Sequence, residues 1–177
     1  MLSPELTIIT RELTAVFEKL SREDVERAAR CIRSHGRVFI GGAGRSGLML
    51  KAFAMRLGQM GRTVYAAGES VTPAVERGDL VFLASASGST RTVLHYAQTA
   101  KDTGADLFVV TAVEDSPLSA IHPADVLLPC GGKDSPAGSA QVMGSLFEQT
   151  LLLYCDAVVM ALDPDPDDMR RRHANLE

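Results

Sequence analysis

The sequence contains no tryptophan and three cysteines, and aromatic residues make up 5% of it. Cys31, Cys130 and Cys155 lie far apart and form no Cys-x-x-Cys pair. They therefore predict free thiols in a reducing compartment instead of a disulfide framework. Basic residues are not in excess either: the formal net charge is −4, which argues against a nucleic-acid partner. The four histidines have no metal-ligand spacing, so we expect no metal ion.

A long hydrophobic run is also missing. The longest apolar stretch, near residues 150–162, contains Asp156 and is too short to cross a bilayer. Charged side chains such as Glu5 and Arg11 near the start of the chain exclude the apolar core of a signal peptide. We therefore expect a cytoplasmic protein without a membrane partner. Its 177 residues, 46% of them hydrophobic and 23% charged, predict one globular domain.

Both ends of this domain are predicted to be helical. In residues 1–35, apolar side chains recur at helical spacing, and Ser21 with Asp24 resembles a capping box that starts a second helix. Residues 139–177 begin with a long apolar helix. The prolines of "DPDPDD" break that helix, and a short charged tail follows.

Residues 37–130 alternate between strand-like and helical segments. The strand-like segments are short apolar runs over residues 37–42, 63–68, 79–86, 106–113 and 125–130. This alternation predicts an α/β fold: a single-domain, doubly wound, five-stranded parallel sheet flanked by helices. In the common flavodoxin-like order, 2-1-3-4-5, the first and third strands are neighbours, and a ligand binds beyond their carboxyl ends.

Two glycine-containing loops follow the first and third strands, and each precedes a helix. Gly44, Arg45 and Ser46 belong to the first loop, "GGAGRSG" (residues 41–47). The second loop, "SASGST" (residues 85–90), offers hydroxyl groups on Ser85, Ser87, Ser89 and Thr90. Backbone N–H groups at a helix N-terminus, the helix dipole and hydroxyl donors together suit a phosphate group. Both loops are therefore predicted to bind the phosphate of a small ligand.

Two other interpretations of these loops stay open at this point. Gly42, Gly44 and Gly47 have the G-x-G-x-x-G spacing of an NAD-binding turn, and Glu69 lies about where an acidic ribose partner is expected. Against NAD, the polar side chains of Arg45 and Ser46 crowd the turn, and a dinucleotide does not need the second loop. Each loop also has a purely structural explanation, as a tight strand-to-helix turn or as an N-cap cluster.

Six segments of the chain together resemble a known family. They are "GAGRSG", "FAMRLGQMG", "GES" followed closely by "TP", "SASGST", "MGSLFEQ" and "RRHANLE". From about Val38 to Glu177 the chain is similar to the 6-phospho-3-hexuloisomerases of the sugar isomerase (SIS) domain superfamily. It departs from their pattern at Val142, where a proline is expected before the Met-Gly pair.

The resemblance implies an enzyme that interconverts D-arabino-hex-3-ulose 6-phosphate and D-fructose 6-phosphate. Such enzymes act in the ribulose monophosphate pathway of formaldehyde fixation, or in its reverse. The resemblance also implies a homotetramer that uses no metal and no organic cofactor. Moving the carbonyl group passes through a cis-enediol, which needs a base, a group that transfers a proton between two oxygens, and a clamp on the phosphate.

Glu148 and His173 are the catalytic residues that the resemblance implies. Glu148 would be the base, because apolar surroundings make a carboxylate a stronger base; from the residues alone it also fits an exposed first-turn glutamate. His173 would move the proton between the two oxygens, although by itself it lies on a charged tail. Arg45 is expected to reach the sugar or its phosphate, and Glu69 the sugar hydroxyls, while a surface charge and a loop cap are the alternatives.

The tail also predicts how subunits combine. It is too short to fold back along the last helix to its own strand ends, so we expect His173 to enter the site of a neighbouring subunit. Two alternative functions stay open: another isomerase of the superfamily, such as one acting on arabinose 5-phosphate, and a non-catalytic sugar-phosphate sensor. Those proteins commonly carry regulatory CBS or helix-turn-helix domains, for which this chain has no room.

Overall fold

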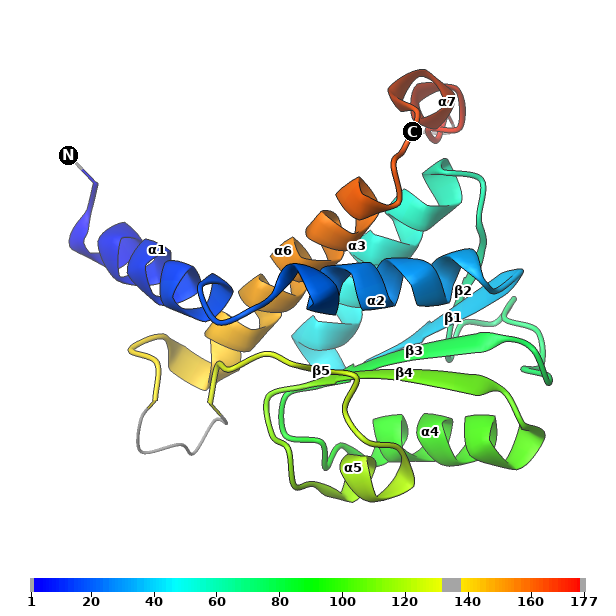
Figure 1. The fold of residues 1–177 in the computed structure, drawn as a ribbon, viewed down its shortest axis with the longest axis horizontal. Coiled ribbons are helices and arrows are strands. Elements are labelled where there is room, and N and C mark those ends of the chain that lie inside the picture. The colour runs from blue at the N-terminus through cyan, green and yellow to red at the C-terminus, as the bar shows by residue number, and fades with distance from the viewer. Residues whose placement is uncertain (1, 132–137, 176–177) are drawn as a thin grey trace.

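A five-stranded parallel sheet forms the centre of the fold (Figure 1). The computed structural model describes residues 2–131 and 138–175. The strands are β1 (Arg37–Gly41), β2 (Thr63–Ala66), β3 (Leu80–Ser85), β4 (Asp106–Thr111) and β5 (Val126–Leu127). They run in the order β2-β1-β3-β4-β5, and every neighbouring pair is parallel. The predicted fold class and strand order are thus confirmed.

The strand order reverses between β1 and β3, and this point positions the site. Gly41, the last residue of β1, pairs with Leu83 of β3. All residues of β3 are buried, and the strand continues to Ser85. The carboxyl ends of the two strands therefore lie side by side, and the loops that follow them lie close together at this edge of the sheet.

Helices cover both faces of the sheet (Figure 1). One face carries α2 (Arg22–Arg33), α3 (Gly44–Gln59) and α6 (Ser145–Ala161), and the other carries α4 (Arg91–Thr103) and α5 (Pro117–Ile121). α1 (Pro4–Phe17) contacts α6, and α7 (Pro166–Arg171) contacts α3. The capping box expected between Ser21 and Asp24 is confirmed at the start of α2.

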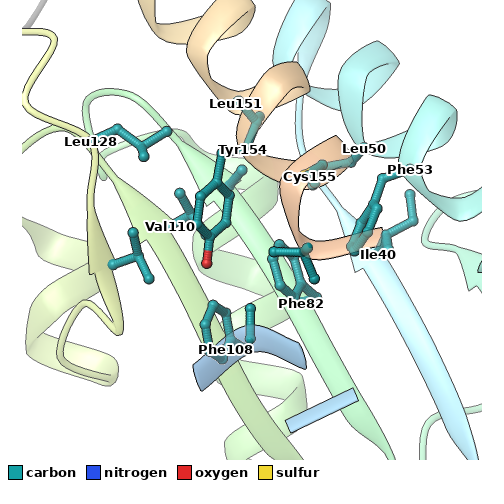
Figure 2. Close-up of a cluster of buried hydrophobic side chains, with 14 of the residues drawn as sticks. Ile40, Leu50, Phe53, Phe82, Phe108, Val110, Leu128, Leu151, Tyr154 and Cys155 are labelled. Carbon is teal, nitrogen blue, oxygen red and sulfur yellow. The ribbon is translucent and has the colours of Figure 1, made fainter. Parts of the chain in front are cut away.

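The larger hydrophobic core lies between the sheet and helices α2, α3 and α6 (Figure 2). Phe53 of α3 contacts Phe82 of β3, whose ring stacks on Phe108 of β4 with ring centres 4.8 Å apart. Tyr154 of α6 is buried, and its hydroxyl donates a hydrogen bond of 2.8 Å to the carbonyl of Asp24 in α2. Because buried aromatic side chains supply much of the apolar contact in a core, this packing holds α6 firmly against the sheet.

α6 is apolar enough to resemble a membrane-spanning helix. An 18-residue stretch within the segment Val142–Ala161 has a mean hydropathy of 1.3. However, half of that stretch is buried inside the fold, where α6 packs against α2 and α3. The segment is also interrupted, because Met143 has a left-handed backbone with φ of 58°. These are properties of a core helix.

The entry to α6 differs from the prediction. The helix was expected from about Ser139, but α6 begins at Ser145, after a 3₁₀ turn over Val142–Gly144. The reason lies in α1, where the carboxylate of Glu12 holds the preceding loop in place. It accepts hydrogen bonds from the Ser139 hydroxyl, the Ala140 backbone N–H and the Gln141 side-chain amide. Glu148 lies in the first turn of α6, which confirms the expectation that it lies near the start of this helix.

Candidate active site

A cavity of about 160 Å³ lies beyond the carboxyl ends of β1 and β3. We call it the loop cavity. Most of the residues predicted to bind phosphate line it, namely Gly44, Arg45, Ser46, Ser85, Ser87 and Thr90. Glu148 and Gly144 from the start of α6 complete its wall. The structure thus brings together two loops and one helix end that are widely separated in the sequence.

The hydroxyl groups of the second loop differ in their burial and in whether they line the loop cavity. Ser85 is buried, and its Oγ lies 3.2 Å from Oγ1 of Thr90. Ser87 is exposed, and its Oγ accepts a hydrogen bond of 2.9 Å from the hydroxyl of Ser89. Ser89 does not line the loop cavity itself. It therefore orients Ser87, while Ser85, Ser87 and Thr90 face the cavity.

Gly88 allows the second loop to turn back on itself. Its φ is +60°, a left-handed conformation in which a side chain is strained. A Cβ at this position would also lie 2.2 Å from the Ser116 hydroxyl oxygen. The Gly88 carbonyl in turn accepts a hydrogen bond of 2.9 Å from the Leu118 N–H in α5. The loop is thus held from behind by α5, a helix that the sequence patterns did not predict.

Helix N-termini at the loop cavity differ from those elsewhere in the fold. α1, α2, α5 and α7 each have a side chain that caps the first turn. Among the described residues, no side chain caps α3, α4 or α6, whose N-caps are Ala43, Thr90 and Gly144. These three residues all line the loop cavity. Free N–H groups and the positive ends of three helix dipoles therefore converge there, which favours an anionic ligand.

Glu148 and Arg45 form an ion pair on the wall of the loop cavity. The Glu148 side chain is 11% exposed and accepts a hydrogen bond from Nε of Arg45, whose own side chain is 60% exposed. Leu146, Phe147 and Leu151 around Glu148 are buried. The helix neighbours of Glu148 are thus buried, while its carboxylate meets the Arg45 guanidinium group, a pairing that no sequence pattern predicted. A carboxylate that can accept a proton and a cation that can face a developing oxyanion lie side by side.

Glu69 lies outside the loop cavity. It follows β2 at the same edge of the sheet, is exposed, and pairs with Nζ of Lys51 on α3. The hydrogen bond and charge of Lys51 lower the pKa of Glu69. Its predicted role as a partner of sugar hydroxyls stays a prediction.

His173 lies far from the loop cavity of its own chain. It is exposed after α7, and its Nδ1 lies 3.1 Å from the carbonyl oxygen of Ala174. The neighbouring Arg172 packs against Gly61, just beyond the C-terminal end of α3, whereas Gly44 at the N-terminal end lines the cavity. A helix of 16 residues is ~24 Å long. The tail therefore starts about one helix length from its own cavity. In Figure 1, α7 lies near the C-terminal end of α3.

A second cavity, of about 360 Å³, shares the lining residue Arg45 with the loop cavity. We call it the α1 cavity, because Glu5, Ile8 and Ile9 of α1 form one wall. Gln149 of α6, which the sequence patterns did not single out, also lines this cavity. The sequence signal that could have identified Gln149 as a site residue is its position directly after Glu148 in "MGSLFEQ".

No metal site is visible in the part of the chain that the structure describes. Within residues 2–131 and 138–175, no three His, Cys, Asp or Glu side chains are grouped so that they could hold an ion. Cys31, Cys130 and Cys155 are free thiols, as predicted. Independence from metals and cofactors stays a prediction that experiments must test.

The fold and the anion-binding geometry define a class of protein, and comparison with known proteins agrees. The SIS domain family matches residues 31–152, so the chain belongs to the SIS domain proteins. Two relatives named 3-hexulose-6-phosphate isomerase are each 42% identical to it. The Mycobacterium gastri protein matches over 97% of this chain and 89% of its own, and the Bacillus subtilis (strain 168) protein over 96% and 95%.

A crystal structure extends this comparison. A protein from Methanococcus jannaschii, for which a molecular function of 3-hexulose-6-phosphate isomerase has been inferred, superposes with a TM-score of 0.82 at 30% identity. The match covers 98% of this chain and 99% of that one. Within the SIS domain proteins, the chain therefore belongs to the 3-hexulose-6-phosphate isomerase family, also called the 6-phospho-3-hexuloisomerases.

Proposed function

We propose that this protein is a 3-hexulose-6-phosphate isomerase, which interconverts D-arabino-hex-3-ulose 6-phosphate and D-fructose 6-phosphate through a cis-enediol. The observation that carries the proposal is the loop cavity. Three helix N-termini without side-chain caps and the hydroxyls of one loop converge there beside a buried carboxylate. The identity of the substrate is inferred from family membership. The proposed metabolic setting is the ribulose monophosphate pathway or its reverse.

The phosphate group binds at the second loop. Ser87 and Thr90 donate hydrogen bonds to its oxygens, together with the free N–H groups at the start of α4 and α3. Charge-assisted hydrogen bonds of this kind hold the remote end of the substrate in one place. The free energy of that binding then orients the reacting carbons against Glu148.

The reaction moves two protons. Glu148 removes the proton from C2, and the electrons of that bond form the C2–C3 double bond while the C3 carbonyl oxygen gains negative charge. Arg45, adjacent to Glu148, stabilises this charge. A proton passes from the C2 oxygen to the C3 oxygen, and Glu148 returns a proton to C3. The products are a carbonyl at C2 and a hydroxyl at C3, without any redox partner.

His173 is proposed to carry the proton between the two oxygens, and to come from a neighbouring subunit of a homotetramer. The distance of the tail from the cavity of its own chain supports this arrangement. Glu148→Gln and His173→Ala should each be nearly inactive. Unfolded and refolded together in equal amounts, they should recover about a quarter of the sites, since subunits assort at random into closed oligomers. A mixture of native size without recovered turnover, in which both variants still bind fructose 6-phosphate, contradicts a shared site.

A coupled assay tests the reaction itself. Hexulose 6-phosphate is supplied, and glucose-6-phosphate isomerase with glucose-6-phosphate dehydrogenase reports the fructose 6-phosphate formed. Turnover of arabinose 5-phosphate at a higher kcat/KM would instead favour the alternative isomerase. Binding of either phosphosugar without turnover would favour the sensor.

The NAD alternative is tested by thermal stability. Fructose 6-phosphate should raise the melting temperature, because a ligand that binds only the folded state stabilises it. NAD should not. The glycine spacing that suggested NAD is explained by the fold, since a Cβ on Gly47 would lie 2.7 Å from the carbonyl oxygen of Gly42. The turn needs that close approach whatever ligand is bound.

A further inference from the structure

The start of α6 directs two neighbouring side chains to two different cavities. Glu148 lines the loop cavity, and Gln149 lines the α1 cavity. Successive residues of a helix project about 100° apart, which accounts for the separation. Arg45 pairs with Glu148 and lines both cavities. None of the hydroxyl-bearing residues of the second loop lines the α1 cavity. A ligand whose phosphate occupies that loop can therefore reach the α1 cavity only with its other end.

The structure of the proposed substrate identifies the group at the end remote from the phosphate. In hex-3-ulose 6-phosphate and in arabinose 5-phosphate, the same number of carbon–carbon bonds separates the phosphate-bearing carbon from the reacting pair. The hexulose has one further carbon, the C1 hydroxymethyl group, on the far side of the reacting pair. An isomerase for the hexulose thus needs the same phosphate-to-base spacing as one for the pentose, with additional space beyond the base.

The side chain of Gln149, which lines the α1 cavity, has an unused hydrogen-bonding group. Its Oε1 is buried, and no described residue donates a hydrogen bond to it. A buried carbonyl oxygen that accepts no hydrogen bond costs free energy. Conformations of Gln149 in which this oxygen accepts a hydrogen bond are therefore favoured. The terminal amide of glutamine turns about a broad torsion, which lets Oε1 face the cavity. The α1 cavity is where a donor from a ligand can arrive.

We propose that the α1 cavity is the subsite for the C1 hydroxymethyl group, and that Gln149 determines specificity there by accepting a hydrogen bond from the C1 hydroxyl. The inference rests on the proposed function and extends it, because it explains how the same phosphate loops serve a hexulose in preference to a pentose. Ile8 and Ile9 of α1 close the apolar side of the subsite.

Two non-reacting ligands test the subsite directly. They are the acyclic alcohols made by reducing fructose 6-phosphate and arabinose 5-phosphate, which differ by the one terminal carbon. Calorimetric titration should give the parent protein a lower Kd for the hexitol phosphate. Gln149→Met keeps the length of the side chain and removes the amide, and should raise the hexitol phosphate Kd about tenfold, the effect of one hydrogen bond. The pentitol phosphate Kd should change less than twofold.

Controls separate this inference from the proposed function. Gln98→Met, at an exposed position of α4, removes a glutamine amide far from both cavities and should alter neither Kd. Ile9→Phe, which narrows the α1 cavity from the other wall, should weaken only the hexitol phosphate and serves if Gln149→Met does not fold. Equal weakening of both ligands, or of neither, overturns the subsite and leaves the proposed function standing. A folded parent protein that binds neither ligand overturns both.

Discussion

Replacing Glu148 with glutamine removes a carboxylate from the wall of the loop cavity and hardly changes the shape of the side chain. If Glu148 is the base, kcat should fall by about 10²–10⁴-fold, the range that general base catalysis contributes, or ~3–5 kcal/mol of barrier. Folding should be affected far less. Arg45 is 60% exposed and stays hydrated without its partner, so the pair contributes only ~0–1 kcal/mol. For a chain of this size, that corresponds to a melting temperature lower by no more than about 4 °C.

Three measurements on one preparation decide the matter: kcat in the coupled assay, Kd for fructose 6-phosphate, and the melting temperature. Asp156→Asn is the matched control, because it removes a carboxylate from an exposed position of the same helix. It should leave all three unchanged. A Glu148→Gln variant that binds fructose 6-phosphate normally and loses less than tenfold in kcat would refute its role as the base.

Three further predictions concern the phosphate, acidity and metals. Ser87→Ala combined with Thr90→Ala should raise KM at least tenfold, because each hydrogen bond to a charged group contributes ~1.5–3 kcal/mol; an unchanged KM would remove the second loop from the site. Although partial burial lowers the pKa of His35, its hydrogen bonds to the Cys31 carbonyl and the Asp106 carboxylate raise it overall. The stability that this histidine contributes is therefore complete below its unfolded-state pKa and is lost as the pH rises through the higher folded-state pKa. The melting-temperature difference between parent and His35→Gln should shrink from pH 5 to pH 9, and a constant difference would contradict the linkage. Treatment with EDTA should leave turnover intact, and activity restored by zinc would show the opposite.

The sheet and its switch point could be predicted because their signals are local. Short apolar runs such as "DLVFLASA" become fully buried strands, and two glycine-containing loops follow the strands that lie at the centre. Predicting that those loops meet needed only the known strand order of such sheets. The loop cavity follows from the same reasoning, since both loops end strands that are neighbours in the sheet.

Features set by contacts between distant residues could not be predicted in this way. Glu12 shortens α6 by holding Ser139 through a contact that crosses 127 positions of the chain. The pairing of Arg45 with Glu148 spans 103 positions, so neither side chain reveals its partner in the sequence. The buried amide oxygen of Gln149 likewise has meaning only beside a cavity that α1 helps to enclose.

The three uncapped helices described above imply a conflict between stability and function. An N-cap side chain contributes ~0.5–2 kcal/mol, and four other helices of this fold have one. A cap placed on α3, as in Ala43→Asp, should therefore strengthen the empty protein while its carboxylate repels the phosphate of the ligand. Selecting variants of this chain for thermal stability alone would favour such changes, and those changes would weaken ligand binding. Under the proposed function, the helix N-termini that a stability engineer would cap first are those at which the phosphate of the substrate takes the place of a capping side chain.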